Sequence, residues 1–89
     1  MKLEIKVHQL FVLNGEQPLK AFADLNINDA IIVKGLKVIE GKQGLLVSMP
    51  YEQGKDSKWY ESVRALDKET REQIQSVVLE AYNNREVNV

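Results

Sequence analysis

The chain has 89 residues, no cysteine, one histidine and a formal net charge of −1 at pH 7. This length predicts a single domain, residues 1–89, without disulfides or a zinc site. No apolar run approaches the ~20 residues of a membrane span, and the N-terminus does not resemble a signal peptide, so we expect a soluble cytoplasmic protein. The charge balance argues against a dedicated nucleic-acid packaging protein but allows a local basic patch.

Alternating apolar and polar residues predict the first two strands. Residues 3–8 and 19–27 alternate with period two, which is typical of half-buried strands, and the first run continues through residues 10–13, where both faces become apolar. Residues 14–18 contain Asn-Gly and end in proline, and they predict the turn between these strands. Ala21 and Ala23 fall on the inward face of the second strand, where their small side chains would let a helix approach closely.

The stretch 31–50 is the most apolar long run, and it predicts two further strands joined by a hairpin at residues 41–44. Its apolar positions change from odd to even at Gly35. One face of a strand cannot change parity without an extra residue, so we expect a β-bulge there. Pro50 should end the second of these strands because it has no N–H to donate.

The C-terminal part predicts a loop, a short strand and a helix. Residues 51–58 are polar and predict an exposed mobile loop, and residues 59–63 predict a short strand that returns to the sheet edge. Asp67 is the expected N-cap of a helix that ends near residues 83–84. Residues 85–89 would fray or add a short strand. The apolar stripe of the helix comprises Ile74, Val77, Val78, Ala81 and Tyr82.

These elements predict an α+β fold, an antiparallel β-meander of four to five strands packed by one C-terminal α-helix. A helix ~10–12 Å across would leave part of a sheet roughly 15–20 Å wide uncovered. We therefore expect a homodimer, formed by face packing or by strand pairing at an edge. The alternative is that sheet twist and the loop at 51–58 cover the apolar surface. The expected interface residues are Phe22, Ile32, Leu46 and Leu79.

No residue pattern predicts catalysis, so we expect no enzyme, no catalytic residue, no cofactor and no small-molecule substrate. His8 lies on the charged face of its strand and is interpreted as a surface residue. Asp24, Asp29 and Glu40 could be imagined as an acidic metal cluster, but turn and strand positions explain each of them. No metal site is therefore expected.

A specific pattern of residues occupies the central run and the helix. In the run it comprises Val33, Leu36, Lys37, Val38, Ile39, Gly41, Gly44, Leu45, Leu46, Val47, Met49 and Pro50, and in the helix Thr70, Arg71, Ile74, Gln75, Val78, Leu79 and Tyr82. This pattern closely resembles the family of stage V sporulation protein G, SpoVG, over nearly the whole chain. The chain departs from the family at Gly35, where an acidic residue is usual, and at Arg64-Ala65, where the family tends to have His-Pro.

The resemblance implies a small dimeric bacterial regulator linked to septum formation, sporulation or gene control. It also implies binding of DNA or RNA through basic residues in the C-terminal half. The candidate nucleic-acid-binding residues are Arg71, Lys68, Arg64, Lys58 and Lys55. The rings of Tyr51, Trp59 and Tyr60 could stack on nucleic-acid bases. Acidic residues are interleaved with them, so a solvated mixed-charge surface is the plainer interpretation. The alternative function is a dimeric protein-interaction module without nucleic-acid binding.

Overall fold

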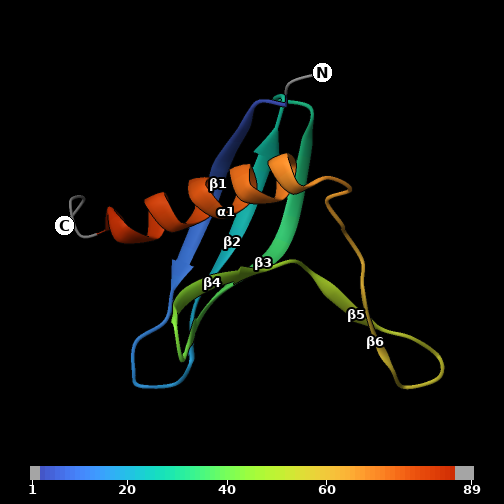
Figure 1. The fold of residues 1–89 in the computed structure, drawn as a ribbon, viewed down its shortest axis with the longest axis horizontal. Coiled ribbons are helices and arrows are strands. Elements are labelled where there is room, and N and C mark those ends of the chain that lie inside the picture. The colour runs from blue at the N-terminus through green and yellow to red at the C-terminus, as the bar shows by residue number, and fades with distance from the viewer. Residues whose placement is uncertain (1–2, 86–89) are drawn as a thin grey trace.

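The computed structural model describes residues 3–85, which form one four-stranded antiparallel sheet, a two-stranded hairpin and one helix (Figure 1). The sheet has the order β1-β2-β3-β4. Its strands are β1 (Ile5–Val12), β2 (Leu19–Ile27), β3 (Ile31–Gly41) and β4 (Gly44–Ser48), the hairpin is β5 (Tyr51–Gln53) with β6 (Trp59–Glu61), and the helix is α1 (Lys68–Asn83). The predicted α+β meander with one C-terminal helix is thereby confirmed. Most of the predicted tail, residues 86–89, lies outside the described part of the chain.

The β-bulge predicted at Gly35 is confirmed. Ala23 pairs with Leu36 and Leu25 pairs with Val33, so two residues of β3 stand opposite Asp24 of β2. Gly35 has φ +89°, and its backbone N–H donates to Asp24 Oδ1 at 3.3 Å. The bulge therefore gives the buried Asp24 carboxylate a backbone donor, a role that the alternation of β2 did not predict.

Replacing Gly35 with alanine is expected to lower the free energy of unfolding by about 1–2 kcal/mol, because an L-residue resists the left-handed region. A Cβ at this position would meet only Pro50 Cβ at 3.9 Å, an ordinary contact, so backbone strain dominates. Gly35→Asn is the control, since asparagine tolerates positive φ better. Urea unfolding should rank the stabilities as wild type, then asparagine, then alanine, and equal losses for both variants would contradict the strain argument.

The segment between β4 and α1 differs from the prediction. Residues 51–58 are not simply a loop, because Tyr51–Gln53 pairs with Trp59–Glu61 in a hairpin of its own, which we call the arm. The strand predicted at 59–63 does not return to the main sheet. Figure 1 shows the arm projecting away from the body of the protein. At its base, Ser62 N–H donates to Pro50 carbonyl at 2.9 Å, which closes the hairpin where β4 ends.

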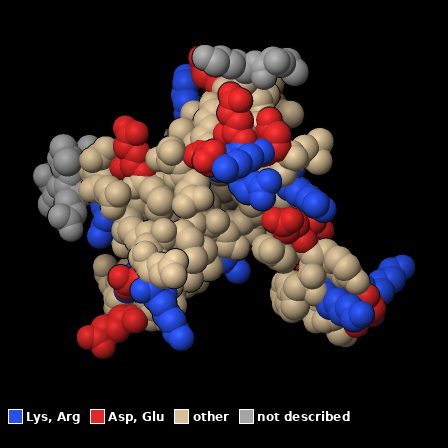
Figure 2. Space-filling view, viewed as in Figure 1, with Lys and Arg blue, Asp and Glu red and all other residues tan. Residues whose placement is uncertain are grey.

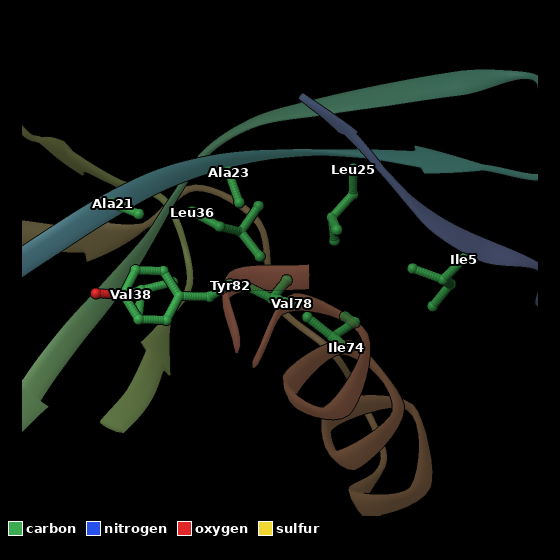
Figure 3. Packing of buried hydrophobic residues seen from close by; sticks show 9 residues of the cluster. All are labelled: Ile5, Ala21, Ala23, Leu25, Leu36, Val38, Ile74, Val78 and Tyr82. Carbon is green, nitrogen blue, oxygen red and sulfur yellow. The ribbon is translucent and has the colours of Figure 1, made fainter. Parts of the chain in front are cut away.

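Helix α1 begins and ends as predicted. The side chain of Asp67, the N-cap, accepts from Thr70 N–H at 3.1 Å, and Asn84 is the C-cap. In the described chain no helix is both long and apolar enough to cross a membrane. The buried cluster joins the helix to all of β1, β2 and β3 (Figure 3). Its members are Ile5, Ala21, Ala23, Leu25, Leu36, Val38, Ile74, Val78 and Tyr82.

The helix lies across the strands rather than along them (Figure 1). Its 16 residues are ~24 Å long at ~1.5 Å per residue, more than the roughly 15 Å between the outermost of four strands. The prediction that one helix leaves part of the sheet width uncovered was therefore wrong, because the length of the helix spans that width. The helix has more neighbouring residues in β1 and β4 than in β2, and Ala21 and Ala23 are buried in the cluster that contains Ile74, Val78 and Tyr82 of the helix.

The outer face of the sheet, opposite the helix, carries no covering element in residues 3–85. The strand pairings place Phe11 beside Phe22, and Leu46 beside Ile39, on this face. Phe11, Ile32 and Leu46 are 48%, 41% and 43% exposed. Of the four expected interface residues, Phe22, Ile32 and Leu46 lie on this face. Leu79 is on the helix, where it is half-buried and packs against the core of its own chain, so its role at an interface stays a prediction.

Candidate nucleic-acid interface

Two of the predicted basic residues lie together beside the beginning of α1. Arg64 and Arg71 line one hollow of about 200 Å³, with Met49, Glu61 and Leu66. Arg71 also lines a neighbouring hollow of about 260 Å³ between β4 and the helix. The hollows exist because α1, the arm base and the segment before the helix meet there. Residues far apart in the sequence, from Met49 to Arg71, thus share one surface. We call the hollow lined by both Arg64 and Arg71 the arginine hollow.

The charges around the arginine hollow are mixed. Within residues 3–85, neither Arg64 nor Arg71 has its guanidinium within 4.0 Å of a carboxylate oxygen. Glu61 nevertheless lines the hollow from the arm, and sequence reasoning had not assigned it a role there. Figure 2 shows Lys and Arg side chains interleaved with Asp and Glu side chains where α1 begins. The hollow offers two guanidinium groups to an anion, together with one opposing carboxylate.

The helix N-terminus itself is occupied by its cap. Asp67 accepts hydrogen bonds from the Thr70 hydroxyl and backbone N–H, and these bonds, the hydroxyl first, lower the pKa of Asp67 from its ordinary 3.8. Arg71 adds a smaller attraction in the same direction. A phosphate at this end would therefore meet arginine side chains rather than uncapped N–H groups. Lys68, in the first turn, is exposed and lines neither hollow.

The cap predicts an acid-dependent loss of stability. Folding lowers the pKa of Asp67. The stability that its carboxylate contributes is therefore fully present above pH 3.8, and it is lost as the pH falls through the lower pKa of the folded state. Asp67→Asn should remove this dependence, since asparagine caps helices without titrating. Thermal unfolding followed by circular dichroism should show the wild type losing stability faster than the asparagine variant below pH 3.8. Parallel curves for the two proteins would contradict the assignment.

Lys55 and Lys58 lie in the arm, so the structure does not bring them into the arginine hollow. The arm is held by its own hydrogen bonds: Gly54 N–H donates to Lys58 carbonyl at 2.8 Å, and Lys58 N–H donates to Asp56 Oδ1 at 3.0 Å. The Tyr60 hydroxyl donates to Asp56 Oδ2 at 2.5 Å. That bond, more than the one from Lys58, lowers the pKa of Asp56, and it raises the pKa of Tyr60.

The aromatic residues of the arm are exposed rather than buried in this chain. Tyr51, Trp59 and Tyr60 are 48%, 64% and 51% exposed. The pairings of Tyr51 with Glu61 and of Gln53 with Trp59 put Tyr51 and Trp59 on one face. Tyr60 lies on the other face, bonded to Asp56, so its role within the chain is structural. Tyr51 and Trp59 are the two rings that a base or another surface could contact.

The acidic residues considered as metal ligands have separate structural roles. Asp24 accepts from Gly35 N–H, Asp29 exchanges two hydrogen bonds with Asn26, and Glu40 pairs with Lys20 at 3.6 Å. In the described part of the chain, no group of three His, Cys, Asp or Glu side chains could hold a metal ion. The turn and strand roles predicted for these residues agree with this arrangement.

Comparison with known proteins identifies the family. The model of the SpoVG family matches residues 1–84. The chain belongs to the SpoVG family. Three of its relatives are named "Putative septation protein SpoVG". They come from Archaeoglobus fulgidus (36% identity, covering 93% of this chain and 98% of the relative), Anaeromyxobacter sp. strain Fw109-5 (35%, 91% and 82%) and Bdellovibrio bacteriovorus (38%, 89% and 69%).

The family match confirms the resemblance inferred from residues 33–50 and from the helix. The names of the relatives connect those proteins with septation. The five basic residues divide into the arginine hollow, the first turn of α1 and the arm. Nothing in the sequence signals this division, because it depends on where the arm folds back on itself.

Proposed function

We propose that this SpoVG protein is a non-catalytic regulator connected with septation, which binds DNA or RNA as a dimer through the arginine hollow. The observation that carries the proposal is the pair Arg64 and Arg71, which line one hollow without an ion pair to a carboxylate in residues 3–85. Guanidinium groups suit phosphate because their donors form a fork that can bind two oxygens.

The arm supports the same proposal in a second way. Its Tyr51 and Trp59 rings share an exposed face, and rings of this kind stack on unpaired bases without sequence preference. Lys55 and Lys58 add positive charge to the arm. Binding through these cations should weaken as the salt concentration rises, because it depends on counterion release from the phosphates.

Arg71→Glu is expected to weaken binding to short DNA and RNA oligonucleotides and to reduce the slope of log affinity against log salt by about 1. The substitution should leave the fold intact, because Arg71 is exposed and an acidic side chain is favourable near a helix N-terminus. Fluorescence anisotropy over a salt series measures both quantities.

Lys6→Glu is the matched control, since it changes the formal net charge of the chain, which is −1, by the same amount. Lys6 lies on strand β1 and pairs with Glu4 at 3.7 Å. It should change binding much less than Arg71→Glu. Equal weakening by both variants would mean that only net charge matters. Wild-type protein that binds no oligonucleotide at low salt would end the proposal and favour the protein-interaction module, for which the exposed outer sheet face is the observation.

A further inference from the structure

The connection between β1 and β2 contains the only asparagine of the sequence that is followed by glycine. Asn14 and Gly15 are both exposed to solvent. In such a pair the backbone nitrogen of the glycine can attack the side-chain amide carbon of the asparagine, because the two atoms are close in the chain and no side chain shields the nitrogen. Asparagine is thermolabile in proteins, and this pair is where the chain is most open to that chemistry.

The fold itself requires glycine at position 15. Gly15 has φ +120°, in a region that side chains resist, and a Cβ at this position would collide with Oε1 of Gln17. Any other residue would therefore strain the connection. The structure thus keeps an unshielded backbone nitrogen directly after Asn14.

Hydrogen bonds to the two neighbouring carbonyl groups favour the attack. The Gly15 nitrogen must lose its proton to become a nucleophile, and the negative charge that results is shared with the Asn14 carbonyl oxygen of the same peptide group. Gln17 Nε2 donates to that oxygen at 3.1 Å, so it stabilises the charged form. Lys20 Nζ donates to the Gly15 carbonyl at 3.4 Å and places a positive charge beside the next peptide group.

The asparagine in the turn after β2 shows the opposite arrangement. Asn28 Oδ1 accepts from the Glu4 N–H at 2.7 Å, which holds its side chain. The N–H of Asp29, the nitrogen that would have to attack it, donates to Asn26 Oδ1 at 2.9 Å. In residues 3–85, by contrast, no hydrogen bond holds the side-chain amide of Asn14. The two turns therefore differ in both partners of the reaction.

We propose that Asn14 is a modification site, which converts slowly to aspartate and isoaspartate with assistance from Gln17. The Gly15 nitrogen gives its proton to solvent and bonds to Cγ of Asn14. The bond from Cγ to the side-chain nitrogen breaks, and that nitrogen takes up a proton from water and leaves as ammonia. Water then adds to one of the two carbonyl carbons of the cyclic imide, and the bond from that carbon to the Gly15 nitrogen breaks. Opening at Cγ gives aspartate, and opening at the main-chain carbon gives isoaspartate.

The conversion changes both charge and main-chain length. The formal net charge of the chain, −1, becomes more negative by one unit. Isoaspartate also adds a methylene group to the main chain of a connection that is closed by the hydrogen bond from Leu13 N–H to Lys20 carbonyl at 2.9 Å. Figure 1 shows this connection at the end of the sheet remote from the start of α1, where the arginine hollow lies. The inference therefore does not rest on the proposed function.

The first test is incubation of the folded protein in water labelled with heavy oxygen, at mildly alkaline pH. Trypsin cleaves after Lys6, Lys20 and Lys34, so it separates the peptide that contains Asn14 from the peptide that contains Asn26 and Asn28. Mass spectrometry should show that the first peptide exchanges an amide nitrogen for one heavy oxygen, while the second stays unchanged. An unconverted first peptide, or equal conversion of both peptides, would overturn the proposal.

Gln17→Leu tests the assistance from Gln17. Gln17 is exposed, so the variant should fold as the wild type does. Conversion of the folded variant should be slower by roughly two- to tenfold, which is the effect of one hydrogen bond open to water. In concentrated urea the two proteins should convert at the same rate, because the hydrogen bond exists only in the folded chain. Equal rates in buffer, or a difference that persists in urea, would contradict the role of Gln17.

Discussion

Replacing Leu36 with alanine is expected to lower the free energy of unfolding by about 2–5 kcal/mol. Leu36 is 0% exposed and belongs to the cluster that joins the sheet to Val78 of the helix. Removing its side chain loses the transfer free energy of the buried methyl and methylene groups and leaves a cavity that the curled sheet cannot fully close. A small domain is stabilised by only about 5–15 kcal/mol, so this one change removes a large part of the total.

The matched control is Leu66→Ala, the same chemical change at a side chain that is 94% exposed. It should alter the free energy of unfolding by no more than about 0.5 kcal/mol. Urea unfolding at one fixed protein concentration compares the two variants, because association would make stability depend on concentration. Similar losses for both leucines would contradict the assignment of the core.

Replacing Ala23 with leucine is expected to destabilise the protein by about 1–3 kcal/mol through overpacking. Ala23 is 0% exposed, and its β3 partner is Leu36, which is also 0% exposed. A larger side chain at this position has no open space to enter, so neighbouring side chains must leave their preferred rotamers. Thermal and urea unfolding should both show the loss.

Ala30→Leu serves as the control for this insertion. Ala30 is exposed in the turn between β2 and β3, so the same added atoms reach solvent. Its free energy of unfolding should stay within about 0.5 kcal/mol of the wild type. An Ala23→Leu variant as stable as Ala30→Leu would mean that the sheet can open to accommodate the side chain.

The strands and the helix of the body could be predicted because their signals are local. Alternation within 19–27 follows from one face being buried, and the parity change at Gly35 required an extra residue somewhere near it. Asp67 predicted the helix start for a similar reason, since its carboxylate reaches an N–H group only three residues away. Each of these inferences depends on residues that are close together in the chain.

The arm and the arginine hollow could be predicted only in part. Residues 59–61 form a strand as expected, but backbone donors and acceptors are the same on every strand, so local sequence does not say which strand is the partner. Because β6 pairs with β5, Lys55 and Lys58 lie in the arm, and Glu61 lies beside Arg64 and Arg71. The sequence could name the basic residues but not this division.

Sequence by itself determined the α+β class, the order of the elements, the bulge and the SpoVG family. Tertiary structure alone decided that α1 crosses the strands, that Leu79 packs against the core of its own chain and that β4 pairs with one strand only within residues 3–85. The physical reason is range: turns, caps and alternation arise between near neighbours, whereas the direction of a helix on a sheet depends on how whole surfaces pack. Which edges stay open depends on every pairing in the sheet at once.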